Sequence, residues 1–309
     1  MKTLADNVDC TSSPESSNPT TWTETDTGKT ERDWRSVCYG DGKFVAVGFG
    51  NKAAYSSDGI TWNETTISEP ERNWFSVCYG DGKFVAIADY STTAAYSYDG
   101  ITWTETNVSK TETEWWSVCY GDGKFVAVTS GNKSVFSHDG INWNETTISE
   151  LEEDWNSVCY GNGKFVAVAD YYNKAAYSSD GINWTETKIG EKDHQHWKTV
   201  CYGNGKFVAA APGNKHAYSS DGINWTETNI SEPEFHWWTL CYGNGKFVGV
   251  AYDSNKAAYS YDGIHWNEMR ISEPNRNWES VCYGNGKFVA IAHESNKAAY
   301  ISDDALKMP

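Results

Sequence analysis

The stretch from Trp74 to Val85 reads WFSVCYGDGKFV, and it decides the fold because close copies of it occur seven times along the chain. Each copy has a Trp, one variable residue, and then Ser/Thr-Val/Leu-Cys-Tyr-Gly-Asp/Asn-Gly-Lys-Phe-Val. The Cys marks the register, at Cys38, Cys78, Cys119, Cys159, Cys201, Cys241 and Cys282. A period of about 40 residues with short β segments between turns is typical of a β-propeller blade, which is one four-stranded sheet per repeat.

The second full repeat shows how the strands are expected to divide. Residues 74–79 and 83–87 are predicted to form the first two strands, and residues 94–97 and 101–106 the last two. β-branched and aromatic residues dominate these segments, as a half-buried pleated surface requires. Gly-Asp-Gly and Asp-Gly turns join the strands, because tight hairpins need residues that accept positive φ.

The two ends of the chain predict how the ring closes. The final repeat stops near Asp304 without a fourth strand, whereas residues 21–25 match residues 102–106 of the second repeat. We therefore predict an all-β, seven-bladed propeller with four antiparallel strands per blade. Its single domain covers residues 20–304, and residues 20–27 form the outer strand of the last blade and close the ring. Residues 1–19 are predicted to be a flexible tail, and residues 305–309 a C-terminal tail.

The net charge of the chain argues against nucleic acid as a partner. The chain has 25 basic and 42 acidic residues, a formal net charge of −17. Nucleic acid is not expected as a partner, because phosphate binding needs a basic surface. No apolar run is long enough to be a transmembrane segment, and the first 21 residues lack the apolar region of a signal peptide. No cofactor is predicted.

The eight cysteines do not predict disulfides. Seven stand at equivalent positions in seven repeats, so they cannot pair symmetrically, and we expect reduced, buried thiols. Cys10, in the tail, is the odd one and is either a free or an intermolecular thiol. No Cys/His spacing indicates zinc, so no metal site is predicted.

A second phrase, Ser-x-Asp-Gly followed three residues later by Trp, also recurs. Its aspartates are Asp58, Asp99, Asp139, Asp180, Asp221 and Asp262. The phrase resembles the Asp-box of BNR-type β-propellers, although Asp and Gly are adjacent here and are one residue further apart in that family. The repeats are also similar to those of propellers in bacterial surface and phage tail proteins. The resemblance implies that these aspartates are structural, and that the protein is extracellular, on a cell surface or virion-associated.

Loop composition predicts where a ligand would bind. Alternating antiparallel strands place the near-identical turns on one rim, and the variable B–C loops and D–A connections on the other, which is where binding loops belong. The B–C loops combine aromatic rings with carboxylates, the side chains that bind sugars. The predicted ligand-binding residues in these loops are Tyr90, Tyr171, Tyr172, Tyr252, Asp89, Asp170 and Asp253. The alternative is that polar turn residues simply favour loops.

Trp116 and Trp238 lie outside the repeat pattern. They directly follow the repeated Trp, where the other repeats have Arg35, Phe75, Asn156, Lys198 and Glu279. The two Trp are therefore expected to be exposed, and together with Phe75 they are predicted to bind a ligand. The alternative is that they cover the mouth of the channel. The D–A connections add His194, His196, Phe235 and His236, and the carboxylates Glu112, Glu114, Glu152, Glu153 and Asp154. We expect structural or solvated roles for these residues.

The function predicted first is a non-catalytic, carbohydrate-binding propeller of the lectin or adhesin type. The alternative is a structural or protein-interaction module of a virion, filament or cell surface, so the expected partner is a glycan or a protein surface. A glycoside hydrolase is the least favoured reading. Sialidases share the Asp-box and need an arginine cluster, but none of the five arginines stands in that family's arginine motif.

Overall fold

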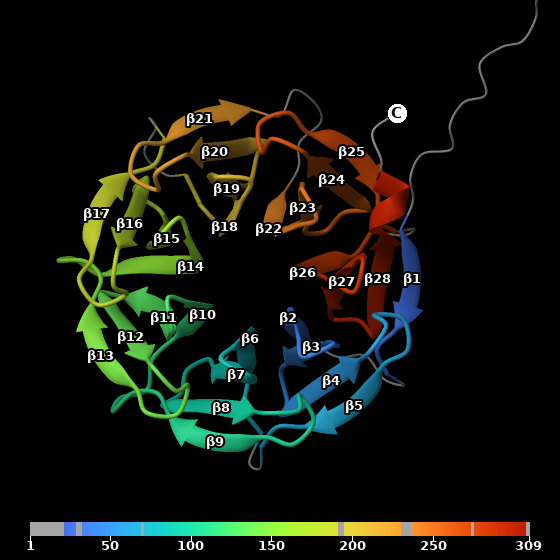
Figure 1. Ribbon diagram of the computed structural model, residues 1–309, viewed down its shortest axis with the longest axis horizontal. Helices are drawn as coiled ribbons and strands as arrows, with labels where there is room; N and C mark the ends of the chain where they lie inside the picture. The colour runs from blue at the N-terminus through green and yellow to red at the C-terminus, as the bar shows by residue number, and fades with distance from the viewer. Residues whose placement is uncertain are drawn as a thin grey trace, which may run out of the picture.

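The structure is a computed structural model that describes residues 22–28, 33–68, 71–190, 195–229, 236–272 and 275–306. The predicted tail at 1–19, together with Cys10, His194 and Phe235, lies outside these residues. The described chain is built from β-strands, in antiparallel sheets arranged around a central axis (Figure 1). This is the all-β propeller architecture expected from the repeat.

Each repeat contributes four strands in chain order, with its first strand nearest the axis, except the last repeat, which contributes three. The innermost strands are β2 (Trp34–Gly40), β6 (Trp74–Gly80), β10 (Trp115–Gly121), β14 (Glu153–Gly161), β18 (Thr199–Gly203), β22 (Trp237–Gly243) and β26 (Asn277–Gly284). The second strands are β3 (Lys43–Gly48), β7 (Lys83–Ala88), β11 (Lys124–Gly131), β15 (Lys164–Asp170), β19 (Lys206–Ala211), β23 (Lys246–Ala251) and β27 (Lys287–His293).

The outer half of each unit is shorter. The third strands are β4 (Lys52–Ser56), β8 (Thr93–Ser97), β12 (Lys133–Ser137), β16 (Lys174–Ser178), β20 (Lys215–Ser219), β24 (Lys256–Ser260) and β28 (Lys297–Ser302). The outermost strands are β5 (Asn63–Thr66), β9 (Thr104–Asn107), β13 (Asn144–Thr147), β17 (Thr185–Lys188), β21 (Thr226–Asn229), β25 (Asn267–Arg270) and β1 (Thr23–Asp26). In the second repeat the outermost strand begins at Thr104, three residues later than predicted, because Ile101 to Trp103 still belong to the preceding turn.

The N-terminal strand completes the sheet of the last repeat. β1 pairs antiparallel with β28, with Thr23 opposite Tyr300 and Asp26 opposite Lys297. Arg276 donates two hydrogen bonds to the carboxylate of Glu24, at 3.1 and 3.0 Å. Trp22 is 7% exposed and packs in one apolar cluster with Trp278 and Leu306. Leu306 ends the short 3₁₀ helix η1 (Asp303–Leu306), so the packed structure continues past residue 304, where the predicted tail begins.

The apolar core lies between neighbouring sheets. One cluster joins Val47 and Ile67 of the first unit to Trp74 and Ala86 of the second, and the other clusters repeat this arrangement. All seven Trp residues that precede the variable position are at most 1% exposed. Each sheet therefore buries its two faces against its neighbours, as the repeat architecture requires.

The inner strands approach one another closely at glycine. A Cβ atom added to Gly161 at the end of β14 would lie 2.0 Å from the ring of Tyr202 in β18. The equivalent glycines meet the equivalent tyrosines in the same way from repeat to repeat, and Gly284 of the last unit meets Tyr39 of the first. No other residue fits here without moving the backbone.

We predict that Gly161→Ala lowers the free energy of unfolding by about 3 kcal/mol, because the methyl group overpacks a ring that cannot move away. Asp122→Asn, at the equivalent turn of the preceding repeat, is the control, since Asn stands at the same turn position in four other repeats. It should change stability by no more than about 0.5 kcal/mol. Urea denaturation measures both, and equal stabilities for the two variants would contradict the packing argument.

Trp22→Ala should lower the free energy of unfolding by about 3–5 kcal/mol, because it removes a large buried side chain from the last unit. Thr23→Ala, an exposed neighbour on the same strand, serves as the control. A melting temperature unaffected by Trp22→Ala would show that β1 does not hold the last sheet in place.

Candidate functional site

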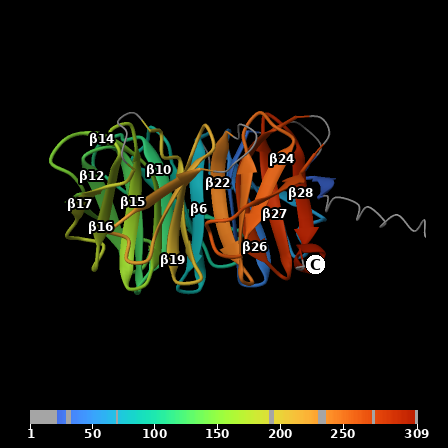
Figure 2. The same cartoon turned by 90° about the horizontal axis from the view of Figure 1, so that it is seen from above.

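The turns of one rim are nearly identical, and hydrogen bonds connect turns of neighbouring units. The amides of Asn162, Asn204 and Asn285 donate hydrogen bonds to backbone carbonyls in the Ser-x-Asp-Gly turns of the following units, at 3.2–3.3 Å. Asn285 reaches Ser57 of the first unit. The strands run from this rim to the opposite one (Figure 2), where the B–C loops meet the connections that lead to the next unit.

The six repeated aspartates close their own turns. In the third unit the Oδ1 atom of Asp139 accepts hydrogen bonds from the backbone N–H groups of Ile141 and Asn142, at 2.9 and 2.7 Å, and from Ser137. The other five make the same backbone contacts. Burial alone would raise the pKa of Asp139, but these hydrogen bonds outweigh it and hold the pKa well below its usual value.

The variable rim differs from unit to unit. The residues that follow the repeated Trp lie at the rim end of the inner strands and are called here the channel belt. They are Arg35, Phe75, Trp116, Asn156, Lys198, Trp238 and Glu279. In six units a β-bulge falls at this residue, between the Trp and the following Ser or Thr. A bulge re-aims a side chain that would otherwise alternate with its neighbours.

Belt side chains of neighbouring units contact one another. Arg35 Nη1 donates to Glu279 Oε1 at 2.7 Å, and its guanidinium lies 5.4 Å from the centre of the Phe75 ring. Phe75 meets Trp116 edge to face, with ring centres 4.9 Å apart. On the other side, Lys198 Nζ lies 5.5 Å from the ring centre of Trp238. Residues 40 or more positions apart in the sequence thus contact one another at the belt.

The predicted ligand residues Trp116 and Trp238 are half-buried, so the expectation that they are exposed is wrong. The cause is the neighbouring aromatic rings, since Trp238 also packs on Tyr252 with ring centres 4.8 Å apart. The indole Nε1 of Trp116 is buried and has no hydrogen-bond partner, and the same holds for Nε of Arg35. Two buried donors at the belt therefore have no acceptor within the described chain.

Burial changes the ionisation of the belt and its neighbours. Burial raises the pKa of Glu279, and the Arg35 guanidinium only partly opposes the effect. Burial and the same guanidinium lower the pKa of His293, whose Nε2 lies 3.0 Å from Arg35. Burial also raises the pKa of Asp89 to about 6, and the nearby Glu114 adds to the shift. Sequence reasoning missed Arg35, Glu279 and His293, although the variability of the belt position was a signal.

The remaining predicted residues have different surroundings. Asp170 is not a free ligand, because it pairs with His196 at 2.5 Å and with Lys198 at 2.6 Å. Burial would raise its pKa, but these two partners lower it. Asp253 is exposed at the tip of its loop. Tyr90, Tyr171 and Tyr172 are exposed by 67%, 44% and 58%, at positive φ that a bulky residue rarely adopts.

The described part of the chain offers little support for thiol chemistry or a metal site. The cysteines of the repeats are free thiols there, and burial raises their pKa, which makes them poor nucleophiles. His196 pairs with Asp170, and no group of three or more His, Cys, Asp or Glu among the described residues is placed to hold a metal ion. Within the same residues no helix has the length and apolarity that crossing a membrane demands.

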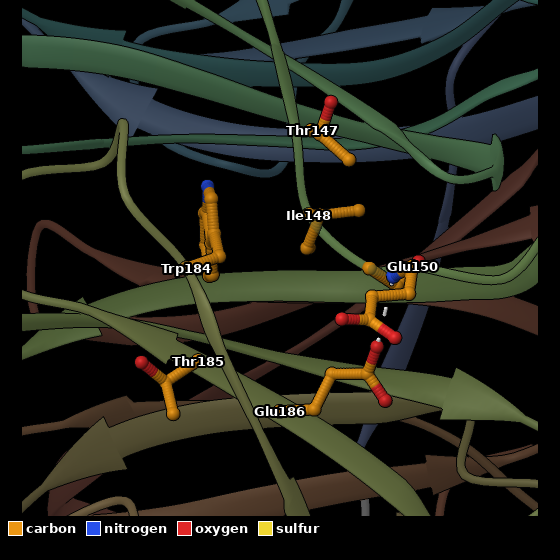
Figure 3. A pocket seen from close by; sticks show the side chains of 7 residues that line it. Thr147, Ile148, Glu150, Trp184, Thr185 and Glu186 are labelled. Atoms are coloured by element: carbon orange, nitrogen blue, oxygen red, sulfur yellow. Dashed lines mark hydrogen bonds between the residues drawn. The ribbon is translucent and has the colours of Figure 1, made fainter.

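A hollow of about 520 Å³ lies between the outer strands β13 and β17 (Figure 3). The Glu150 N–H donates to Glu186 Oε1 at 3.1 Å, and Trp184 lines one side. The preceding unit has the same contact, from the Lys110 N–H to Glu145. This hollow therefore follows from the repeat and does not distinguish one place on the molecule.

Comparisons with known proteins concern the fold. No family model matches the chain, and no curated protein matches its sequence. Among solved structures, virginiamycin B lyase from Staphylococcus aureus has a TM-score of 0.82 at 14% identity, over 91% of this chain and 98% of the lyase. YCF48 bound to D1 peptide has 0.74 at 15%, over 94% and 98%. The WD40 propeller domain of Doa1 has 0.70 at 13%, over 91% and 97%.

These similarities show the β-propeller fold and correct one expectation. The prediction that the protein is not an enzyme is contradicted, because an enzyme, virginiamycin B lyase, shares the fold along nearly all of the chain. That expectation rested on the absence of the sialidase arginine motif, which argues against one kind of enzyme only. Because another protein with this fold is an enzyme, the absence of that motif does not exclude catalysis.

The turn geometry makes a test in acid possible. Replacing Asp139, Asp180 and Asp221 together by Asn should cost roughly 0.5–1.5 kcal/mol per site at pH 7, because each charged acceptor becomes a neutral one. The pKa of these groups is lower in the folded chain than in the unfolded one. Their stabilisation is therefore complete above about pH 4 and is lost as the pH falls further.

The melting temperature of the unmodified protein should fall steeply between pH 4 and pH 2, and that of the triple variant should fall less. The control, Asp41→Asn/Asp81→Asn/Asp122→Asn, changes the charge equally at turns where Asn already stands in the other four repeats. Parallel pH profiles for all three proteins would show that the Ser-x-Asp-Gly carboxylates do not stabilise the fold.

Proposed function

We propose that this chain is a protein-interaction propeller that binds a segment of a partner polypeptide at the channel belt. The observation that carries the proposal is the belt itself. Its seven equivalent positions hold mostly different side chains, and six of these contact another belt residue. Two buried donors there, Trp116 Nε1 and Arg35 Nε, lack acceptors. A backbone carbonyl of a peptide would supply one, and aromatic rings and Arg are the residues that dominate protein interfaces.

The architecture behind this proposal is a closed, seven-bladed propeller in which β1 completes the last blade. Its support is the pairing of β1 with β28 and the contacts between the last and first inner strands. The Ser280 Oγ accepts from the Val37 N–H at 3.1 Å, as Ser36 does from Val77 in the next pair. We also propose that the Ser-x-Asp-Gly turns are Asp-boxes, on the strength of their hydrogen bonds.

Peptide binding is favoured over the carbohydrate reading for two reasons. One of the similar propellers, YCF48, is bound to a D1 peptide. In addition, Asp170, expected to bind sugar hydroxyls, is taken up by Lys198 and His196. Carbohydrate binding remains a prediction and becomes an outcome of the test.

The test is selection of phage-displayed random 12-residue peptides on the intact protein, followed by fluorescence anisotropy with the selected peptides. Trp116→Ala and Trp238→Ala should each weaken binding about 10- to 30-fold, as loss of an interface aromatic does. Tyr98→Ala is the control, because Tyr98 is 62% exposed on the opposite rim. Melting temperatures show that the variants are folded.

The proposal fails if no peptide is selected, or if the selected peptides bind the Trp variants as well as the parent protein. A glycan array run in parallel completes the design. A glycan signal that Trp116→Ala abolishes, without peptide binding, would establish the carbohydrate reading instead.

A further inference from the structure

Within the described residues, the pairing on the variable rim departs from the repeat where the third and fourth units join. Elsewhere on this rim single bridges link a B–C loop to the next connection, as between Ser91 and Thr113. Here β11 and β14 form a short ladder, with Ser130 opposite Asp154 and Gly131 opposite Glu153, so that two sheets merge into one of eight strands.

Two adjoining hollows, of about 480 and 240 Å³, lie beside this ladder and share Ser130, Gly131 and Glu152. Together they are called here the acidic groove. Its charged and aromatic lining consists of Tyr90, Glu112, Glu114, Lys133, Glu152, Glu153, Asp154, Asp170, Tyr171 and Tyr172.

The groove carries negative charge that the described residues do not neutralise. Glu112, Glu114 and Glu152 form no ion pair with a Lys or Arg of the described chain, whereas Lys133 pairs with Glu145 at 3.6 Å outside the groove. Glu153 is 6% exposed, and its Oε1 lies 2.5 Å from Lys174 Nζ. Its other oxygen, Oε2, is buried without a hydrogen-bond partner. An unpartnered carboxylate oxygen this deeply buried needs a donor.

Aromatic rings stand at both ends of the groove. Tyr90 lines one hollow and Tyr171 and Tyr172 line the other, and Leu151 beside them is 67% exposed. The Glu114 carboxylate raises the pKa of the Tyr90 hydroxyl, so this ring lies next to a carboxylate. Exposed rings beside carboxylates provide both the face and the charge that Lys and Arg side chains bind.

We propose that the acidic groove binds a Lys- or Arg-containing extended segment of a partner protein, with its cations between the tyrosine rings and the groove carboxylates. This rests on the proposed function in that the partner is a polypeptide, and it adds the partner's charge and the place where that charge lies. The β11–β14 ladder positions the groove, because it pairs Glu153 and Asp154 with Gly131 and Ser130 where the two sheets join, and Glu152 directly precedes them.

Fluorescein-labelled octa-arginine is the probe, with a Gly-Ser octapeptide as the neutral reference, measured by anisotropy at low salt with the full chain. The groove variant is Glu112→Gln/Glu114→Gln/Glu152→Gln. The matched control is Asp41→Asn/Asp81→Asn/Asp122→Asn, which also removes three negative charges, but from the opposite rim. We expect about a tenfold or greater loss of affinity in the groove variant and less than about threefold in the control.

Tyr90→Ala/Tyr172→Ala should weaken octa-arginine binding several-fold, whereas Tyr98→Ala should not. Equal losses in the two charge variants would overturn the proposal, since they would show attraction to overall charge only. Absence of octa-arginine binding to the parent protein would also overturn it. If octa-arginine does not bind but the phage-selected peptides still need Trp116 for binding, the proposed function stands and only the groove proposal fails. The two failures are therefore distinguishable.

Discussion

The structure depends on a contact between backbone and ring that is repeated around the axis. The glycine that ends each inner strand lies against the tyrosine of the next unit, and a single Cβ at Gly40 would stand 2.0 Å from the Tyr79 ring. Because no side chain separates the two, neighbouring inner strands are held at a fixed spacing at this rim. The sheets can then bury the repeated Trp residues between them. The apolar core therefore lies between neighbouring sheets and not along the central axis.

This constraint explains why differences between repeats concentrate at the other rim. The near-identical turns carry the Gly–Tyr contacts, the aspartate hydrogen bonds and the Asn-to-carbonyl bonds between units, so they tolerate few residue types. At the opposite ends of the strands the bulge places one side chain per unit on the channel belt. Its contacts are with other variable residues, such as Arg35 with Glu279. The two ends of one strand are thus under different physical demands.

The sheets could be predicted from the sequence, because period, turn chemistry and β propensity agree in every repeat. Within the predicted closing strand at 20–27, Thr23–Asp26 pair with β28. Prediction from the sequence failed where partners come from different repeats. Trp116 and Trp238 were taken as exposed because charged residues occupy the same position elsewhere. The structure shows that Arg35 is accommodated by Glu279, 244 residues away. A periodic pattern shows equivalent positions, but it does not show which of them meet.

The belt and the acidic groove are electrostatically connected through Asp89. Its carboxyl group is destabilised in the charged form by burial and by Glu114, which lines the groove, and is stabilised by Arg35, which belongs to the belt. A cation in the groove would offset the repulsion by Glu114 and favour ionised Asp89. Ionised Asp89 would in turn draw on the positive charge of Arg35. On the proposed function, occupation of the groove and the charge balance of the belt are therefore linked through the ionisation of Asp89.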